Sequence, residues 1–265
     1  MQAQLSFSLR VWLATRHMVR AWGFIFYVAA AVWVLLLSPS TYTGASMQRV
    51  LRRIYLDTLP VLLGFTLLAA LLCMVLTRIV VVTATSYGLS SYALEMVIRV
   101  LVLELIPLTS ALFVAMRCTI PNGTDMLQLR TSGAWAQREQ RGEDLLRQEV
   151  LPRILSGVFA CITLAALSCV VGLVTAYLGV YGPSWAGLQG YTRMFGRIFD
   201  PSVTLLFTLK VWLSSWAVAV IPVATGMFTR HTAGAVLRGD ELRGLARMFA
   251  VLLIIEMLSL IGNYY

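Results

Sequence analysis

Five long apolar runs divide the chain, and each is long enough, or nearly so, to cross the hydrocarbon core of a bilayer as a helix, which takes about 20 residues. A sixth run, from Trp22 to Leu37, is shorter and ends at Ser38-Pro39-Ser40. The longest hydrophilic stretch, Arg117 to Arg153, is too short for a catalytic domain and suits one or two helices. The pattern predicts an all-α integral membrane protein with crossing helices over 58–82, 92–116, 154–181, 202–227 and 245–263.

The distribution of arginines sets the expected orientation. If the short run Trp22–Leu37 does not cross, 16 of the 20 arginines lie on the inner side, as expected from the excess of basic residues on cytoplasmic loops. If it did cross, the three most N-terminal arginines would move to the outer side. We therefore expect amphipathic, interfacial or re-entrant helices over 1–57 and five transmembrane helices over 58–265, with the N-terminus cytoplasmic and the C-terminus outside.

Composition agrees with a membrane protein. Hydrophobic residues make up 59% of the chain, charged residues 12%, and mean hydropathy is +0.80, whereas a soluble domain has about 25% charged residues. The net charge of +9 follows from the topology, so we do not expect nucleic acid as a partner. The four cysteines and two histidines have no metal-site or disulfide spacing, so no metal is expected.

Two opposite charges lie inside apolar runs. Glu104 lies in the second crossing run, and Lys210, the only lysine, lies in the fourth. A charge at mid-bilayer costs at least ~3 kcal/mol, so such residues usually face other helices or a water-filled cavity. Because both residues lie at comparable depth from the outer ends of their runs, we predict an ion pair between them. The alternative is that this pair only fixes helix packing and has no role in transport.

The remaining intramembrane charges divide into a pair and two single residues. Glu95 and Arg99 are four residues apart in the favourable order and are expected to neutralise one another. Arg78 can reach the outer headgroups, and the sequence indicates no partner for Glu256. Pro107 removes a backbone hydrogen bond, so we expect a bend in the second crossing helix.

Several motifs are absent from the sequence. It has no G-x-x-x-x-G-K-[ST], and Lys210 follows Phe207-Thr208-Leu209 rather than glycine, so the chain has no P-loop for nucleotide phosphates. It also lacks H-E-x-x-H and any serine or cysteine nucleophile with a nearby histidine base. We expect a non-enzymatic chain that binds no cofactor itself and relies on a partner for any use of ATP.

A series of residues along the chain carries a family resemblance. Glu104-Leu105-Ile106-Pro107 is followed by a small-residue segment and an arginine, and the later matching positions are Arg117, Asp125, Arg130, Pro152-Arg153, Lys210, Gly226, Gly234, Arg238 and Glu256. With these residues the chain resembles the MlaE/YrbE permeases, the membrane subunits of lipid-transporting ABC systems that work with MCE-domain proteins. After Arg130 this chain reads Thr131-Ser132-Gly133-Ala134 where the family usually has a Glu-Gln step, which leaves open which ATPase it meets.

The resemblance implies a fold and a set of partners. The family begins with in-plane helices before five crossing helices. Two permease chains, identical copies or paralogues, form a lipid cavity that opens toward a ring of MCE domains. ABC ATPase subunits dock on the inner segment 117–153, where Arg117, Asp125 and Arg130 are the expected coupling residues. The expected lipid pocket at the outer end of the first crossing helix consists of Leu76, Arg78, Thr83, Ala84 and Tyr87.

The expected function is a permease of the bacterial inner membrane that moves phospholipid or a related hydrophobic molecule to or from a periplasmic MCE-domain carrier. Two alternatives remain open. One is a permease of the same fold for a sterol or an unusual lipid. The other is an intramembrane lipid-modifying enzyme that uses Glu104 or Glu256 as an acid.

Overall fold

All regular structure in the described part of the chain is helical, which confirms the predicted all-α class. A computed structural model describes residues 7–39, 44–228 and 235–264. Gly234 lies outside the described residues, and for Arg238 only the backbone is described.

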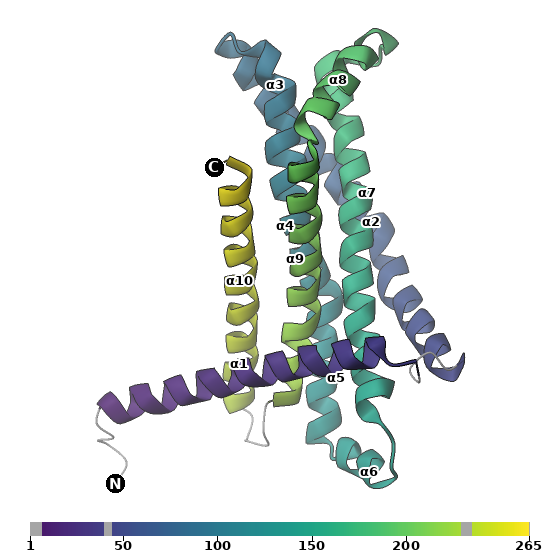
Figure 1. Ribbon diagram of the computed structural model, residues 1–265, viewed down its shortest axis with the longest axis vertical. Helices are drawn as coiled ribbons and strands as arrows, with labels where there is room; N and C mark the ends of the chain where they lie inside the picture. The colour runs from purple at the N-terminus through teal and green to yellow at the C-terminus, as the bar shows by residue number, and fades with distance from the viewer. Residues whose placement is uncertain (1–6, 40–43, 229–234, 265) are drawn as a thin grey trace.

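The helices run alternately between two ends of an elongated bundle (Figure 1). We call these the α8 end and the α6 end. Helix α2 leads to the α8 end, the interrupted helix from α3 to α5 returns to the α6 end, α7 leads back to the α8 end, and α9 and α10 complete the bundle. In chain order the elements are α2 (Gly44–Ser86), α3 (Ser90–Val97), η2 (Ile98–Leu105), α4 (Ile106–Val114), η3 (Ala115–Thr119), α5 (Ile120–Thr131), α6 (Ala134–Gln140), η4 (Leu146–Val150), α7 (Leu151–Tyr181), η5 (Trp185–Gly187), α8 (Leu188–Ile198), α9 (Pro201–Phe228) and α10 (Ala235–Tyr264).

The first helix, α1 (Phe7–Leu37), lies across the bundle toward the α6 end (Figure 1). Its Trp33 stacks on Trp216 of α9, with ring centroids 5.0 Å apart, and its Phe24 lies 5.5 Å from Phe228. By length and composition six helices could cross a membrane, and Met18–Leu37 is one of them. Because α1 lies crosswise to the other five, its direction is that of a helix in the membrane plane.

Helix α2 is longer than the first predicted crossing helix. It continues for 43 residues, so the expected boundary between 57 and 58 falls inside one helix. One continuous helix therefore contains both the apolar run and the basic residues before it, Arg49, Arg52 and Arg53. No glycine or proline interrupts the chain at that boundary, and Pro60 lies within the helix.

Three π-helical stretches interrupt the helices between α3 and α7, and each ends two residues before a proline. η2 precedes Pro107, η3 precedes Pro121, and η4 precedes Pro152. A proline ring clashes with the carbonyl four residues earlier, and the wider π turn, with its i to i+5 bonds, gives that ring room. The distortion expected at Pro107 therefore takes the form of a π-helical stretch over Ile98–Leu105.

The interior contains two apolar clusters. The larger, toward the α6 end, joins α1, α2, α4, α7, α9 and α10, with Val28, Ile154 and Met248 fully buried. The smaller, toward the α8 end, is built around Ile98 and Leu101 of η2. Helices α2 and α7 pack closely along their length. Gly179 of α7 makes this approach possible, because a Cβ there would overlap Thr77 of α2, and Gly172 of α7 likewise leaves room for Ile106 of α4.

Candidate functional site

A buried ion network joins three helices in the half of the bundle toward the α8 end. The ammonium group of Lys210 on α9 contacts the Glu104 carboxylate on η2 and lies 2.8 Å from Oε1 of Glu256 on α10. Its Nζ also donates to the Leu103 carbonyl at 3.2 Å. The side chain of Lys210 is 1% exposed, against 12% for Glu104 and 16% for Glu256. The structure thus brings Glu104 and Lys210 together and adds Glu256, for which the sequence had indicated no partner.

The local structure of each helix sets this geometry. Glu104 is the seventh residue of η2, so the wide π turn directly before Pro107 determines its direction. Lys210 lies nine residues after the start of α9, and Glu256 lies eight residues before the end of α10. Because the two helices are antiparallel neighbours (Figure 1), these positions are level. That equality of depth is the sequence signal that could have assigned Glu256 to Lys210.

The network contains two acids and one base. Asn263 on α10 donates to Oε1 of Glu104 at 3.3 Å, so the second carboxylate oxygen of Glu104 is also hydrogen-bonded. All three helices depend on the same ammonium group, and removal of one partner from a buried pair costs about 3–5 kcal/mol. The two carboxylates therefore share a single cation in this arrangement.

A second polar cluster, toward the α6 end, was not predicted from the sequence. The carboxylate of Asp57 on α2 accepts hydrogen bonds from Ser156 Oγ on α7 at 2.7 Å, from Arg53 Nε at 3.2 Å and from Asn122 Nδ2 on α5 at 3.4 Å. We call these four residues the Asp57 cluster. Asn122 is 2% exposed. The cluster joins α5 to α2 and α7, and the spacing of four between Arg53 and Asp57 was its only sequence signal.

The three expected coupling residues lie on η3 and α5, toward the α6 end, without contacting one another. Arg117 is exposed on η3. Asp125 is half-exposed and lies 3.8 Å from Nη2 of Arg53, which links it to the Asp57 cluster. Arg130 lies over the ring of Trp135, 5.9 Å from its centroid.

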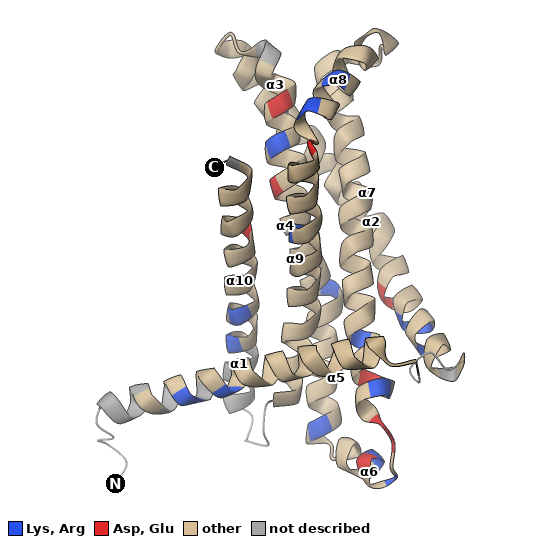
Figure 2. Ribbon diagram, in the orientation of Figure 1, with Lys and Arg blue, Asp and Glu red and all other residues tan. Residues whose placement is uncertain are grey.

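The turn at α6 is held by ion pairs. Arg138 lies 2.8 Å from Glu149 and 2.7 Å from Glu143, and hydrogen bonds to these carboxylates, that to Glu149 first, raise the pKa of Arg138. Figure 2 shows charged residues gathered around α6, with few along the middle of the bundle. This end therefore presents a charged and ordered surface.

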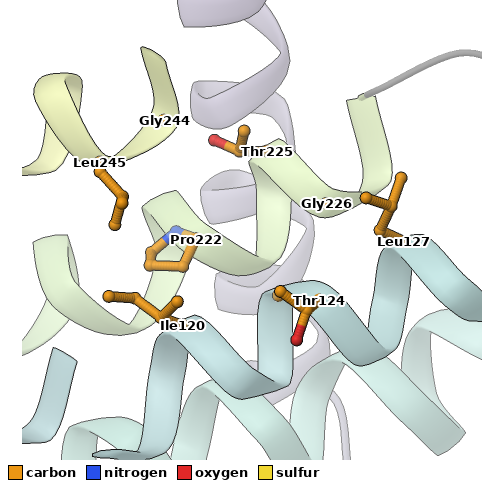
Figure 3. Close-up of a pocket in the computed structure, with 9 residues that line it drawn as sticks. Ile120, Thr124, Leu127, Pro222, Thr225, Gly226, Gly244 and Leu245 are labelled. Atoms are coloured by element: carbon orange, nitrogen blue, oxygen red, sulfur yellow. The ribbon is translucent and has the colours of Figure 1, made fainter. Parts of the chain in front are cut away.

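Helix α5 contacts α9 backbone to backbone. A Cβ on Gly123 would lie 2.7 Å from the Pro222 carbonyl oxygen, and one on Gly226 would overlap the carbonyl of Gly123. Beside this contact is a cavity of about 80 Å³ between α5, α9 and α10, where Pro222 faces Ile120 (Figure 3). The Asn122-Gly123-Thr124 sequence is therefore a packing element and no glycosylation site, because Asn122 is buried.

The five expected lipid-pocket residues do not share one surface. Leu76, Thr83 and Ala84 recur at spacings that place them on one side of α2, and Tyr87 lies in the turn just after the last residue of that helix, Ser86. Arg78 is two residues from Leu76, about 200° round the helix, and lines a different groove, between α2 and α7. The structure thus places Arg78 apart from Leu76, and the lipid-binding role of the five residues stays a prediction.

The predicted pair of Glu95 and Arg99 is present in the structure. Glu95 Oε1 lies 3.0 Å from Arg99 Nε, as the spacing predicts. Among the residues that the structure describes, no group of histidine, cysteine and acidic side chains could hold a metal ion.

Taken with the missing nucleotide motif, these features define a multi-pass α-helical membrane protein with ionic networks inside the bundle. The chain belongs to the family described as Permease MlaE, whose model matches residues 49–261. A comparison with curated proteins gave no match. By this membership the protein is a membrane permease, the membrane subunit of an ABC transporter, and the matched region begins inside α2, beyond α1.

Proposed function

We propose that this protein is the permease that moves phospholipid, or a related hydrophobic molecule, between the bacterial inner membrane and a periplasmic MCE-domain carrier. The observation that carries the proposal is the family match over residues 49–261. The apolar outer part of α2, with Leu76, Thr83 and Ala84 on one side and Tyr87 just beyond its end, suits acyl chains. A sterol or an unusual lipid in the same cavity remains the second candidate cargo.

The α6 end is the proposed docking surface for a separate ABC ATPase. It carries Arg117, Asp125 and Arg130, together with the ion-paired turn around Arg138. The Gly123–Gly226 contact and the Asp57 cluster hold α5 firmly against α9, α2 and α7. A force on α5 from the ATPase would therefore move the bundle rather than only a loop.

A second permease chain and an MCE-domain protein complete the proposed assembly. In this arrangement the α8 end faces the periplasm, the α6 end faces the cytoplasm, and the C-terminus is periplasmic. The arginine distribution supports this orientation. The second chain is either an identical copy or a paralogue.

Co-purification tests the proposal. We expect the tagged chain to retain an ATPase and an MCE-domain protein, and lipid mass spectrometry of the purified complex to identify phospholipid. Asp125→Arg together with Arg130→Glu should release the ATPase but keep the MCE-domain protein. A chain that purifies without either partner, and that modifies a lipid alone, would support the enzyme alternative instead.

A further inference from the structure

The groove between α2 and α7 is a surface apart from the proposed transport cavity. It has a volume of about 630 Å³, and its lining includes Met74, Val75 and Ile79 of α2 and Leu178 of α7. Its lining includes none of Leu76, Thr83, Ala84 and Tyr87, and Arg78 lies about 200° round α2 from Leu76. The lining is apolar enough to hold a hydrocarbon chain, and it is a different set of residues from the proposed lipid cavity.

One cation lies in this apolar lining. Arg78 is exposed, and none of the ion pairs among the described residues includes it. It lies eight residues before the end of α2, about 12 Å along the helix axis. At that depth a guanidinium group can extend to the phosphate layer while its stem stays in the apolar region.

A buried hydroxyl group in the same lining also lacks a partner. Thr77 is 1% exposed, and its Oγ1 makes no hydrogen bond to the described residues. It is buried because α7 has Gly179 opposite, where a Cβ would lie 2.5 Å from Thr77 Cγ2. A buried hydroxyl without a partner is costly, and an ester oxygen of a lipid is a suitable acceptor once the hydroxyl turns toward the groove.

We propose that the α2–α7 groove binds one anionic phospholipid of the surrounding bilayer. The Arg78 guanidinium binds the phosphate bidentately, as guanidinium groups do with phosphates. One acyl chain extends along Met74, Val75 and Leu178 toward the bundle centre. An anionic lipid is favoured over a zwitterionic one because no acidic residue lines the groove to bind a cationic headgroup.

Lipid retention by the full chain tests this site. The protein is reconstituted in phosphatidylcholine vesicles with a minor fraction of phosphatidylglycerol and extracted in detergent, and the lipids that remain bound are quantified by mass spectrometry. The wild-type chain should be enriched in phosphatidylglycerol. Arg78→Gln should lower that enrichment about fivefold, the effect of one basic residue near an anionic headgroup.

Matched variants separate this site from general surface charge. Arg193→Gln removes an exposed arginine of α8, outside the groove, and should leave retention unchanged. Val75→Trp should fill the groove and lower retention, whereas Leu71→Trp, one turn away and equally exposed at 56% against 57% for Val75, should not. Size-exclusion profiles confirm that each variant is folded.

The proposal is overturned if Arg78→Gln retains as much phosphatidylglycerol as the wild type, or if Arg193→Gln loses as much as Arg78→Gln. Displacement of the lipid by glycerol phosphate would also overturn it, since that would show a site for the anion alone. The assay contains no ATP, ATPase or carrier protein, so its result does not depend on whether the proposed transport function is correct.

Discussion

At Lys210 a single ammonium group contacts two carboxylates, and this dependence makes it the most sensitive residue of the bundle. Lys210→Met would leave Glu104 and Glu256 adjacent and buried without a cation. We expect this change to lower the free energy of unfolding by about 3–5 kcal/mol. Thermal unfolding and size-exclusion chromatography of the detergent-solubilised chain measure it. A variant with wild-type stability and transport would show that the network is dispensable.

A triple variant separates a structural role from a transport role. Lys210→Met combined with Glu104→Gln and Glu256→Gln leaves no uncompensated charge, so most of the lost stability should return. If the network only fixes helix packing, transport should return as well. If the triple variant recovers its stability but still shows no transport, the charges themselves take part in transport.

The Asp57 cluster offers a smaller and cleaner test. Ser156→Ala removes the 2.7 Å hydrogen bond from the buried Ser156 to the half-buried Asp57 carboxylate, and we expect a loss of about 1.5–3 kcal/mol, as for other hydrogen bonds to charged groups. Ser202→Ala is the matched control, since Ser202 makes a similar bond to Asp200 at an exposed site. That control should change stability by less than about 0.5 kcal/mol. Equal effects in a denaturation experiment would contradict the assigned burial.

Among the elements, the contact between α5 and α9 has the least tolerance for added atoms. Gly226→Ala places a methyl group against the Gly123 carbonyl, so the backbones must separate. Gly64→Ala in α2 is the control, because its methyl group meets nothing within 4 Å. We expect the control to stabilise the protein by up to about 1 kcal/mol and Gly226→Ala to destabilise it by about 1–3 kcal/mol, measured by thermal unfolding. If both variants behave alike, the close approach is not real.

The elements also show what the sequence could predict. Apolar runs and arginine counts predicted the crossing helices and the crosswise α1, because both follow from the cost of placing polar groups in hydrocarbon. The comparable depth of Glu104 and Lys210 predicted their contact for the same reason. The π-helical stretches were not predictable in this way, since they precede Pro107, Pro121 and Pro152, whereas Pro60 and Pro222 lie within α-helices that have none.

The Asp57 cluster and the Gly123–Gly226 contact depend on tertiary packing. Arg53 and Asp57 look like an ordinary pair on one helix, and nothing local brings Asn122 or Ser156 to them. A glycine in an apolar segment likewise gives no indication of which helix it will meet. The same limit explains why Arg78 was grouped with Leu76, because the expected pocket came from a family resemblance and not from the helical period.

At the scale of the whole molecule, the alternation of helices predicts opposite locations for the α6 and α8 ends. Ser132→Cys, in the turn before α6, should be protected from a membrane-impermeant thiol reagent in intact cells. Ser184→Cys, in the turn before α8, should be labelled. The four native cysteines are buried or half-buried, so background labelling should be low. Labelling of Ser132→Cys alone would reverse the proposed orientation.

We propose that this chain is a passive lipid permease whose energy comes from a separate ATPase. The most direct test of this proposal is transfer of labelled phospholipid between vesicles containing the purified permease and the MCE-domain carrier, with and without the ATPase. We expect phospholipid transfer that requires both ATP and the ATPase, and no ATP hydrolysis by the permease alone. ATP-driven transfer, or chemical conversion of the lipid, by the permease without the ATPase would contradict it.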